Sequence, residues 1–150
     1  MNAPAAPEPG TAPDSGSVPR RLVRPLAALA AVAMPTAFVG AVDPNTPGHY
    51  PVCPLLQATG WWCPGCGGLR CVHALTRGDL LTAGHDNLMV TLLALAALAL
   101  WVRWTVRAVR GRPAGVRLTG RQTVLLMVAL AVFAVVRNLP IGAGLAPPAV

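Results

Sequence analysis

Three long runs of uncharged, mostly apolar residues constrain this chain more than any other feature of its sequence. They extend over residues 25–42, 88–102 and 123–136. At 1.5 Å per residue in a helix, the first run is roughly 27 Å long, close to the hydrocarbon thickness of a bilayer. Only 11% of all residues are charged, and this is about half the share usual in soluble proteins. A water-facing surface needs more charge, so we predict an all-α membrane protein with three transmembrane helices.

Each run also allows a second interpretation. The second and third runs are shorter than the roughly 18 apolar residues that identify a membrane span, so they can also be buried helices of a soluble protein. The first run follows three arginines and ends near Val39-Gly40-Ala41, which resembles a cleavage site. Basic residues followed by an apolar run and small residues are typical of a secretory signal.

We expect the chain to consist of a tail, a membrane domain and a second, shorter tail. Residues 1–19 are rich in Pro, Ala, Gly and Ser and offer little to bury, which predicts a disordered tail. The membrane domain is expected over residues 20–141 and the C-terminal tail over 142–150. The first span should begin at Pro25 and kink at Pro35. The three spans are expected at about 25–42, 86–109 and 121–140. The Cys-rich outer loop between the first two spans is expected at 43–85.

The arginines predict how the chain is oriented in the membrane. Only Arg70, Arg77 and Arg137 lie in the outer loop or at the end of the third run. The other nine precede the first run or surround the connection between the second and third runs: Arg20, Arg21, Arg24, Arg103, Arg107, Arg110, Arg112, Arg117 and Arg121. Because cytoplasmic segments carry the excess of positive charge, we expect the N-terminus and residues 103–121 in the cytoplasm and the outer loop on the extracytoplasmic side.

This distribution of charge also predicts the partners. The lipid bilayer is the first expected partner, and a membrane protein or a second copy of the chain is the next. A basic loop can bind nucleic acid, but no aromatic platform or binding fold accompanies the arginines here. Nucleic acid is therefore not an expected partner.

The outer loop holds most of the side chains that can react or bind a metal. All four cysteines and all three histidines lie within residues 43–87. A short interfacial or re-entrant helix is expected to begin near Cys66–Gly68, with a Cys-x-x-Cys loop at its start, and to end at Gly78. Trp61 and Trp62 precede this loop. We expect them at the membrane interface, with burial in the protein as the alternative.

Helical geometry predicts which of these side chains meet. On a helix that begins at Cys66, Arg70 and His73 lie on the same face as Cys66. Cys71 is about 140° away from Cys66 and should point elsewhere. The predicted cluster consists of Cys53, Cys63, Cys66 and His73.

Three interpretations of this cluster remain open. An extracytoplasmic location favours a disulfide among Cys53, Cys63 and Cys66. A Cys-x-x-Cys pair can also chelate zinc, with Cys53 and His73 completing a tetrahedron. Finally, the pair can exchange disulfides if a helix N-terminus lowers the pKa of the Cys66 thiol. The distances among the sulfur atoms distinguish a disulfide from a metal site.

The remaining charged and polar residues suggest a structural network at the outer end of the helices. An unpaired charge at the end of the third span is costly, so Arg137 is expected to pair with Asp79 or Asp86. The alternative is that Arg137 extends toward the interface. Asn87 is expected to cap or cross-link helix ends. The predicted network consists of Arg70, Asp79, Asp86, Asn87 and Arg137.

Several short motifs in a fixed order resemble the DUF2752 family of small bacterial integral membrane proteins. They fall on Cys53-Pro54, Gly60, Cys63-Pro64, Cys66-Gly67, Arg70, Gly78-Asp79 and Asn87. The flanking Asp43-Pro44 and the Arg-Asn-Leu-Pro sequence at 137–140 also look like family signatures, so the resemblance covers roughly residues 40–140. It implies a multi-pass protein of a bacterial cytoplasmic membrane and no particular activity.

Three classes of function follow from these observations. The first is a structural or interaction protein whose cysteines brace the extracytoplasmic loop. The second is a zinc-binding membrane module, and the third is a membrane thiol–disulfide oxidoreductase. The sequence offers no nucleophile–base pair or paired carboxylates above chance, so catalytic residues are not predicted and a hydrolytic enzyme is not favoured.

Overall fold

In a computed structural model of the chain, the described residues, 17–112 and 119–147, contain helices and no strands. The α-helices are α1 (Val18–Ala41), α2 (Pro54–Thr59), α3 (Gly68–Thr76), α4 (Leu80–Val109) and α5 (Gly120–Val136). A 3₁₀ helix, η1 (Pro140–Leu145), follows α5. The predicted all-α class is therefore confirmed. Nearly all of the predicted disordered tail, residues 1–16, lies outside the described residues.

The two longest helices, α1 and α4, are each long and apolar enough to cross a membrane. Only 11% and 6% of their most apolar stretches are buried within the molecule, whereas a core helix of a soluble protein is mostly buried. Their apolar side chains therefore face outward, as a membrane span requires. The shorter α5, with 17 residues, is also apolar.

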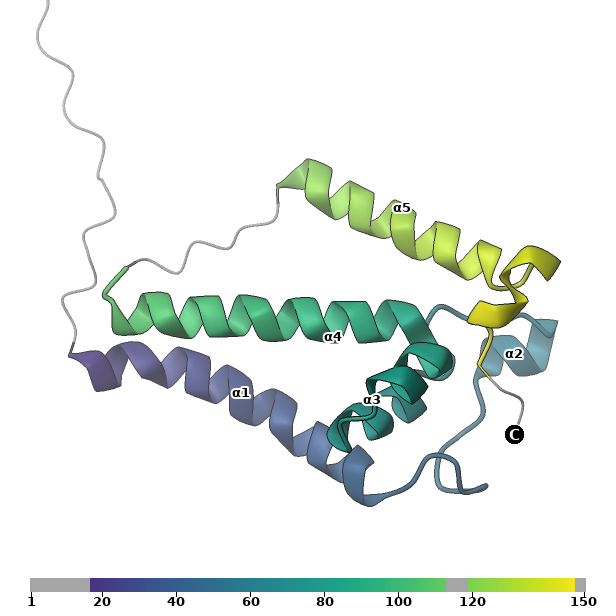
Figure 1. Ribbon diagram of the computed structural model, residues 1–150, viewed down its shortest axis with the longest axis horizontal. Coiled ribbons are helices and arrows are strands. Elements are labelled where there is room, and N and C mark those ends of the chain that lie inside the picture. Colours follow the sequence, from purple (N-terminus) through teal and green to yellow (C-terminus); the bar gives the residue numbers. More distant parts are fainter. Residues whose placement is uncertain (1–16, 113–118, 148–150) are drawn as a thin grey trace, which may run out of the picture.

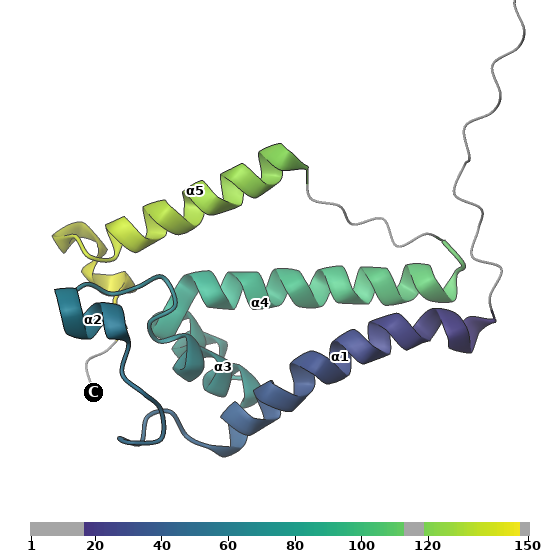
Figure 2. The same cartoon turned by 180° about the vertical axis from the view of Figure 1, so that it is seen from behind.

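Long helices α1, α4 and α5 extend from a common end of the molecule, where the short helices gather (Figure 1). Helix α1 ends there, α4 begins there and α5 ends there, with α2, α3 and η1 beside them (Figure 2). The small buried core at this end contains Cys71, Ala74 and Ala83, with Leu75 and Val90 packed against it. We call this end of the molecule the cysteine end, because all four cysteines belong to it.

The opposite end carries basic residues on both α1 and α4. The first turns of α1 contain Arg20, Arg21 and Arg24, and the last turns of α4 contain Arg103 and Arg107. The two helices are joined near this end, where the indole Nε1 of Trp101 donates a hydrogen bond of 2.9 Å to the Pro25 carbonyl. These arginines of α1 and α4 are thus separated from the cysteines by the length of the helices (Figure 1).

Several helix boundaries differ from those predicted. Helix α1 begins at Val18 instead of Pro25. Pro19 lies in its first turn, where proline is tolerated because backbone N–H groups there have no partner within the helix. Helix α4 begins at Leu80, and its backbone leaves helical geometry at Asn87, with φ −162° and ψ 97°. Helix α5 ends at Val136, four residues before the predicted end of the third span.

Helix α2 was not predicted from the sequence. Pro54 lies in the first turn of α2, where proline is tolerated, and Gly60 ends the helix in the left-handed conformation, with φ 71°. The Cys-Pro and Gly signals at its two ends are the sequence features that mark this helix. Its importance is positional, because Cys53 is its N-cap residue.

Candidate metal centre

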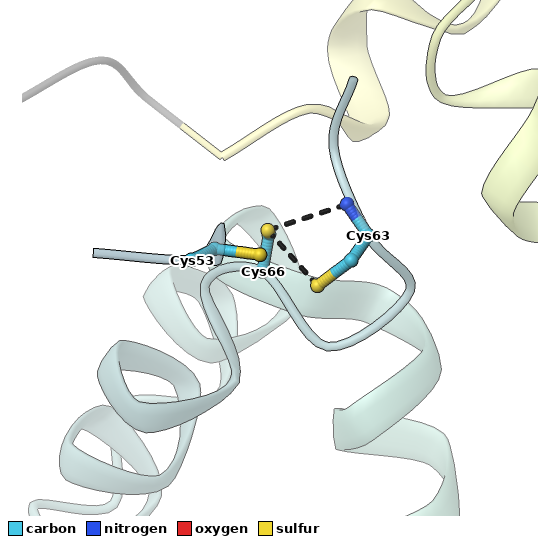
Figure 3. Close-up of side chains that lie close together, drawn as sticks. All are labelled: Cys53, Cys63 and Cys66. Atoms are coloured by element: carbon cyan, nitrogen blue, oxygen red, sulfur yellow. Dashed lines mark hydrogen bonds between the residues drawn. The ribbon is translucent and has the colours of Figure 1, made fainter. Parts of the chain in front are cut away.

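Three cysteines bring their sulfur atoms together at the cysteine end. Cys53 lies at the start of α2, and Cys63 and Cys66 lie in the turn that precedes α3. All three Sγ atoms lie within 4.8 Å of one another. The Sγ atoms of Cys63 and Cys66 are 3.0 Å apart, and the Cys63 backbone N–H donates to the Cys66 Sγ at 3.3 Å (Figure 3). All four cysteines of the chain carry free thiols. We refer to Cys53, Cys63 and Cys66 as the cysteine cluster.

The turn from Cys63 to Cys66 is formed by local hydrogen bonds and by a glycine. The Cys66 N–H donates to the Cys63 carbonyl at 3.1 Å, which brings the two side chains to the same side. Gly67 follows with φ 80°, a conformation that non-glycine residues adopt only with strain. A Cβ atom at Gly67 would overlap the Asp86 carbonyl oxygen. The turn therefore lies directly against the backbone of α4.

Arg137 and Asn87 hold this turn from two different helices. The Arg137 guanidinium donates to the Cys63 carbonyl at 2.9 Å and to the Cys66 carbonyl at 3.2 Å. The Asn87 amide donates to the Pro64 carbonyl at 2.9 Å and to the Cys66 carbonyl at 3.0 Å. Both side chains are almost wholly buried, at 1% and 0% exposed. Three carbonyls of the turn are thereby satisfied by side chains, which fixes the backbone that carries two of the three thiols.

Asn138 also holds Trp62, the residue before the turn, through hydrogen bonds to its backbone. Its side-chain oxygen accepts from the Trp62 backbone N–H at 2.8 Å, and its amide donates to the Trp62 carbonyl at 2.9 Å. Two hydrogen bonds from one side chain thus connect the segment after α5 to the segment before Cys63. The sequence prediction did not assign a role to Asn138, and the Arg-Asn-Leu-Pro sequence at 137–140 is the signal that points to it.

The Arg137 side chain does not pair with Asp79 or Asp86 as predicted. Its guanidinium donates to backbone carbonyls and lies over the Phe133 ring, 5.0 Å from the centroid. Asp79 instead caps α4 by accepting from the Thr82 N–H at 3.0 Å. Asp86 is buried and interacts electrostatically with Arg70. Carbonyl dipoles of the turn thus replace a carboxylate as the partner of the buried arginine.

His73 lies away from the cysteine cluster, which corrects the predicted set of ligands. Its Nδ1 contacts the Val39 carbonyl at 2.9 Å, and its Nε2 lies 3.7 Å from an Asp43 carboxylate oxygen. The prediction assumed one continuous helix from Cys66 to His73. Because Gly67 is left-handed and α3 begins only at Gly68, Cys66 is not on that helix. His73 therefore points toward the end of α1.

Cys71 also lies outside the cluster, on the buried side of α3. It is 0% exposed, and its Sγ contacts the Thr91 hydroxyl of α4 at 3.2 Å. Burial raises the pKa of the Cys71 thiol. Its environment is that of a small core residue that joins two helices.

The thiols of the cluster differ in acidity. Cys53 lies at the start of α2, where a hydrogen bond from the Leu56 backbone N–H lowers the pKa of its thiol to about 7. Burial raises the pKa of the Cys66 thiol to about 12. The predicted effect of a helix N-terminus therefore falls on Cys53 instead of Cys66. At neutral pH the cluster offers one readily formed thiolate, and a bound cation would be needed to ionise the most buried thiol.

The fold and the site together define an all-helical protein with two apolar helices of membrane-spanning length and three converging thiols at one end. A family model described as "Protein of unknown function (DUF2752)" matches residues 53–101. This segment, which includes the whole cysteine cluster, Asn87 and most of α4, belongs to that family. Arg137, Asn138 and Asp43 lie outside the matched residues. No curated protein and no solved structure matches the chain.

Proposed function

We propose that this protein is a multi-pass membrane protein in which Cys53, Cys63 and Cys66 bind one soft metal ion, with zinc the expected metal. The observation that carries the proposal is the convergence of the three Sγ atoms within 4.8 Å of one another. Thiolates are ligands that zinc prefers. A tetrahedral site with zinc–sulfur distances of about 2.3 Å separates its sulfur atoms by about 3.8 Å. The Cys63 and Cys66 sulfur atoms, 3.0 Å apart, would separate by less than 1 Å to reach this value, and all three sulfur atoms already lie within 4.8 Å of one another.

The metal has a structural role in this proposal. Cys53 belongs to the start of α2, whereas Cys63 and Cys66 belong to the turn that Arg137 and Asn87 hold against α4 and α5. A metal bound to all three thiolates therefore links the outer loop to the helical body. This is the bracing role expected of the cysteines, with a metal in place of a disulfide.

The buried guanidinium of Arg137 supports a cluster of thiolates. Zn²⁺ with three thiolates carries a net charge of −1. The Arg137 side chain contacts the backbone of two of the three cysteines and carries one positive charge. Its charge offsets that of the metal complex in a region poor in water, where unbalanced charge is costly.

The membrane part of the proposal assigns three spans, namely α1, α4 and α5. With 17 residues, α5 is roughly 26 Å long, close to the hydrocarbon thickness. The arginines of α1 and α4 lie at the end opposite the cysteines, and positive charge favours the cytoplasm. In a bacterial cytoplasmic membrane, the N-terminus is then cytoplasmic and the cysteine cluster extracytoplasmic. The outward-facing apolar side chains of α5 meet lipid, a membrane protein or a second copy of the chain.

One observation supports a second function, thiol–disulfide exchange. The Cys63 and Cys66 sulfur atoms are 3.0 Å apart, and Cys53, with its lowered thiol pKa, is close to both. In this function a partner's disulfide is reduced to two thiols while Cys63 and Cys66 form a disulfide. Metal binding and disulfide formation exclude each other, because both use the same two sulfur atoms.

Elemental analysis of the protein purified in detergent tests the first function against the second. We expect close to one zinc per chain in the wild type, and a loss of zinc in each of Cys53→Ser, Cys63→Ser and Cys66→Ser. Cys71→Ser is the matched control, because Cys71 is buried beside Thr91 and lies outside the cluster; its zinc content should equal that of the wild type. Metal-free protein with a Cys63–Cys66 disulfide, detected by alkylation before and after reduction, would support the exchange function instead.

A further inference from the structure

The cysteine cluster supplies three ligands, whereas zinc usually takes four. We propose that the fourth ligand comes from solution and reaches the metal through a pocket that opens onto the cluster. The ligand class is a small neutral donor, with water as the resting ligand and a neutral nitrogen or sulfur compound able to replace it. This inference rests on the proposed metal site and deepens it, because it makes the metal open to exchange instead of enclosed.

The protein donors near the cluster account for three positions only. Among residues 17–112 and 119–147, no histidine or carboxylate joins the three cysteines in a metal-binding group. His73 is engaged with Val39 and Asp43, as described above. The hydroxyl of Tyr50, the one tyrosine in the sequence, donates to the Val42 carbonyl at 3.2 Å.

A pocket of about 270 Å³ adjoins all three cysteines. Its wall also includes Trp62 and Tyr50, together with apolar side chains from α2 and α3. Leu56 of α2 and Leu69 of α3 are these apolar side chains, and Arg70 of α3 also lines the pocket. Since Cys53, Cys63 and Cys66 share this one pocket, a metal held by their thiolates has a coordination position that faces it. The small volume and the mostly apolar lining favour a small ligand over a large one.

The balance of charge favours a neutral ligand. A complex of Zn²⁺ with three thiolates has a net charge of −1, and Arg137 offsets it from the side of the helices. Arg70 also lines the pocket, but it interacts with the buried Asp86 carboxylate. A neutral donor leaves this balance of charge unchanged, whereas an anion adds a negative charge that has no further partner. Water is the usual ligand of an open zinc position in proteins.

Cobalt substitution tests the inference with a readout that does not require any activity. Co²⁺ bound to three thiolates has visible absorption bands that respond to a change of the fourth ligand. Imidazole is the probe, because it is small and carries a neutral nitrogen donor. We expect one Co²⁺ per chain and a saturable shift of the visible bands as imidazole is added.

Two tryptophan substitutions test whether the ligand enters through the pocket. Leu69→Trp narrows the pocket from α3, and we expect it to raise the half-saturating imidazole concentration by roughly tenfold or more, equivalent to about 1.4 kcal/mol. Leu81→Trp is the control, because Leu81 is 81% exposed and outside the pocket wall. If Leu69→Trp does not fold, Leu56→Trp narrows the same pocket from α2, with the same expected shift.

The possible failures are distinguishable. Cobalt bands that do not respond to imidazole would mean that the chain supplies the fourth ligand, which overturns the inference while the metal site stands. An unchanged imidazole titration in the pocket variants overturns the route through the pocket. A wild-type protein that binds no Co²⁺ overturns the proposed metal site and the inference with it.

Discussion

Arg137 is the residue on which the geometry of the turn most depends. It is 1% exposed and donates to the carbonyls of Cys63 and Cys66. In Arg137→Leu the Cys63 carbonyl loses its side-chain partner, whereas the Cys66 carbonyl keeps the bond from Asn87. The Cys63 carbonyl keeps only the bond from the Cys66 N–H. Losing two hydrogen bonds from a buried charged group should lower the free energy of unfolding by about 2–4 kcal/mol.

Thermal unfolding in detergent measures this loss. Arg77→Leu is the matched control, because Arg77 is exposed and lies at the same end of the molecule. We expect it to leave the unfolding temperature nearly unchanged. Equal unfolding temperatures for Arg137→Leu and the wild type would contradict the role given to Arg137.

Cys53 should be the most reactive thiol of the cluster in metal-free, reduced protein. The thiolate is the reactive form, and it accumulates as the pH rises through the pKa. The alkylation rate of Cys53 should therefore increase with pH and reach half of its plateau near pH 7. Cys66, whose thiol pKa is about 12, should stay nearly unreactive over the same range.

Peptide mapping by mass spectrometry after timed alkylation distinguishes the two cysteines. Cys71, which is 0% exposed, serves as the unreactive internal reference. Similar pH profiles for Cys53 and Cys66 would show that the start of α2 does not stabilise the Cys53 thiolate.

Gly67 joins the turn from Cys63 to Cys66 to α3, and a substitution at Gly67 tests how closely this junction packs against α4. Gly67 has φ 80°, and a Cβ atom there would overlap the Asp86 carbonyl oxygen. Gly67→Ala should therefore destabilise the protein by more than the roughly 1–2 kcal/mol of a left-handed non-glycine residue alone. It should also weaken metal binding, because the backbone after Cys66 must move.

Gly84→Ala provides the control for this substitution. Gly84 lies within α4, and a Cβ atom there meets open space. Alanine is favoured over glycine in a helix by roughly 0.5–1 kcal/mol, so the unfolding temperature should stay the same or rise. If both alanine variants behave alike, the close contact between Gly67 and α4 does not limit stability.

Some of the helices could be predicted from the sequence, and one could not. Long apolar runs predicted α1, α4 and α5, because a helix of this composition depends on local periodicity and hydropathy. The start of α3 and its end near Gly78 followed from glycine signals. Helix α2 was missed, because a helix of six residues between prolines has no periodicity to detect.

The site required information that local patterns do not contain. The three cysteines were predicted as a cluster because they are close in sequence and share a loop. His73 was wrongly included, since one left-handed glycine changes the direction of every side chain after it. The bonds from Arg137 and Asn138 join residues more than 70 positions apart. Such contacts depend on how α5 returns to the cysteine end, which no local rule specifies.

For the molecule as a whole, the proposed orientation makes a direct prediction. Alkaline phosphatase is active only outside the cytoplasm of a bacterial cell. A fusion after Val150 should be active, because an odd number of spans precedes it, and a fusion after Arg112 should be inactive, because two spans precede it. The opposite pattern would reverse the proposed orientation, and two inactive fusions would remove α5 from the spans.

The central claim, that three thiolates bind one metal ion, is tested most directly by X-ray absorption at the edge of the metal found in the purified protein. The account predicts three sulfur neighbours at about 2.3 Å from zinc and one lighter neighbour from solution. Replacing Cys53 with Ser should remove one sulfur neighbour or the metal, whereas Cys71→Ser should leave the spectrum unchanged. A bound metal surrounded by nitrogen and oxygen alone, or a wild-type protein without stoichiometric metal, would contradict the account.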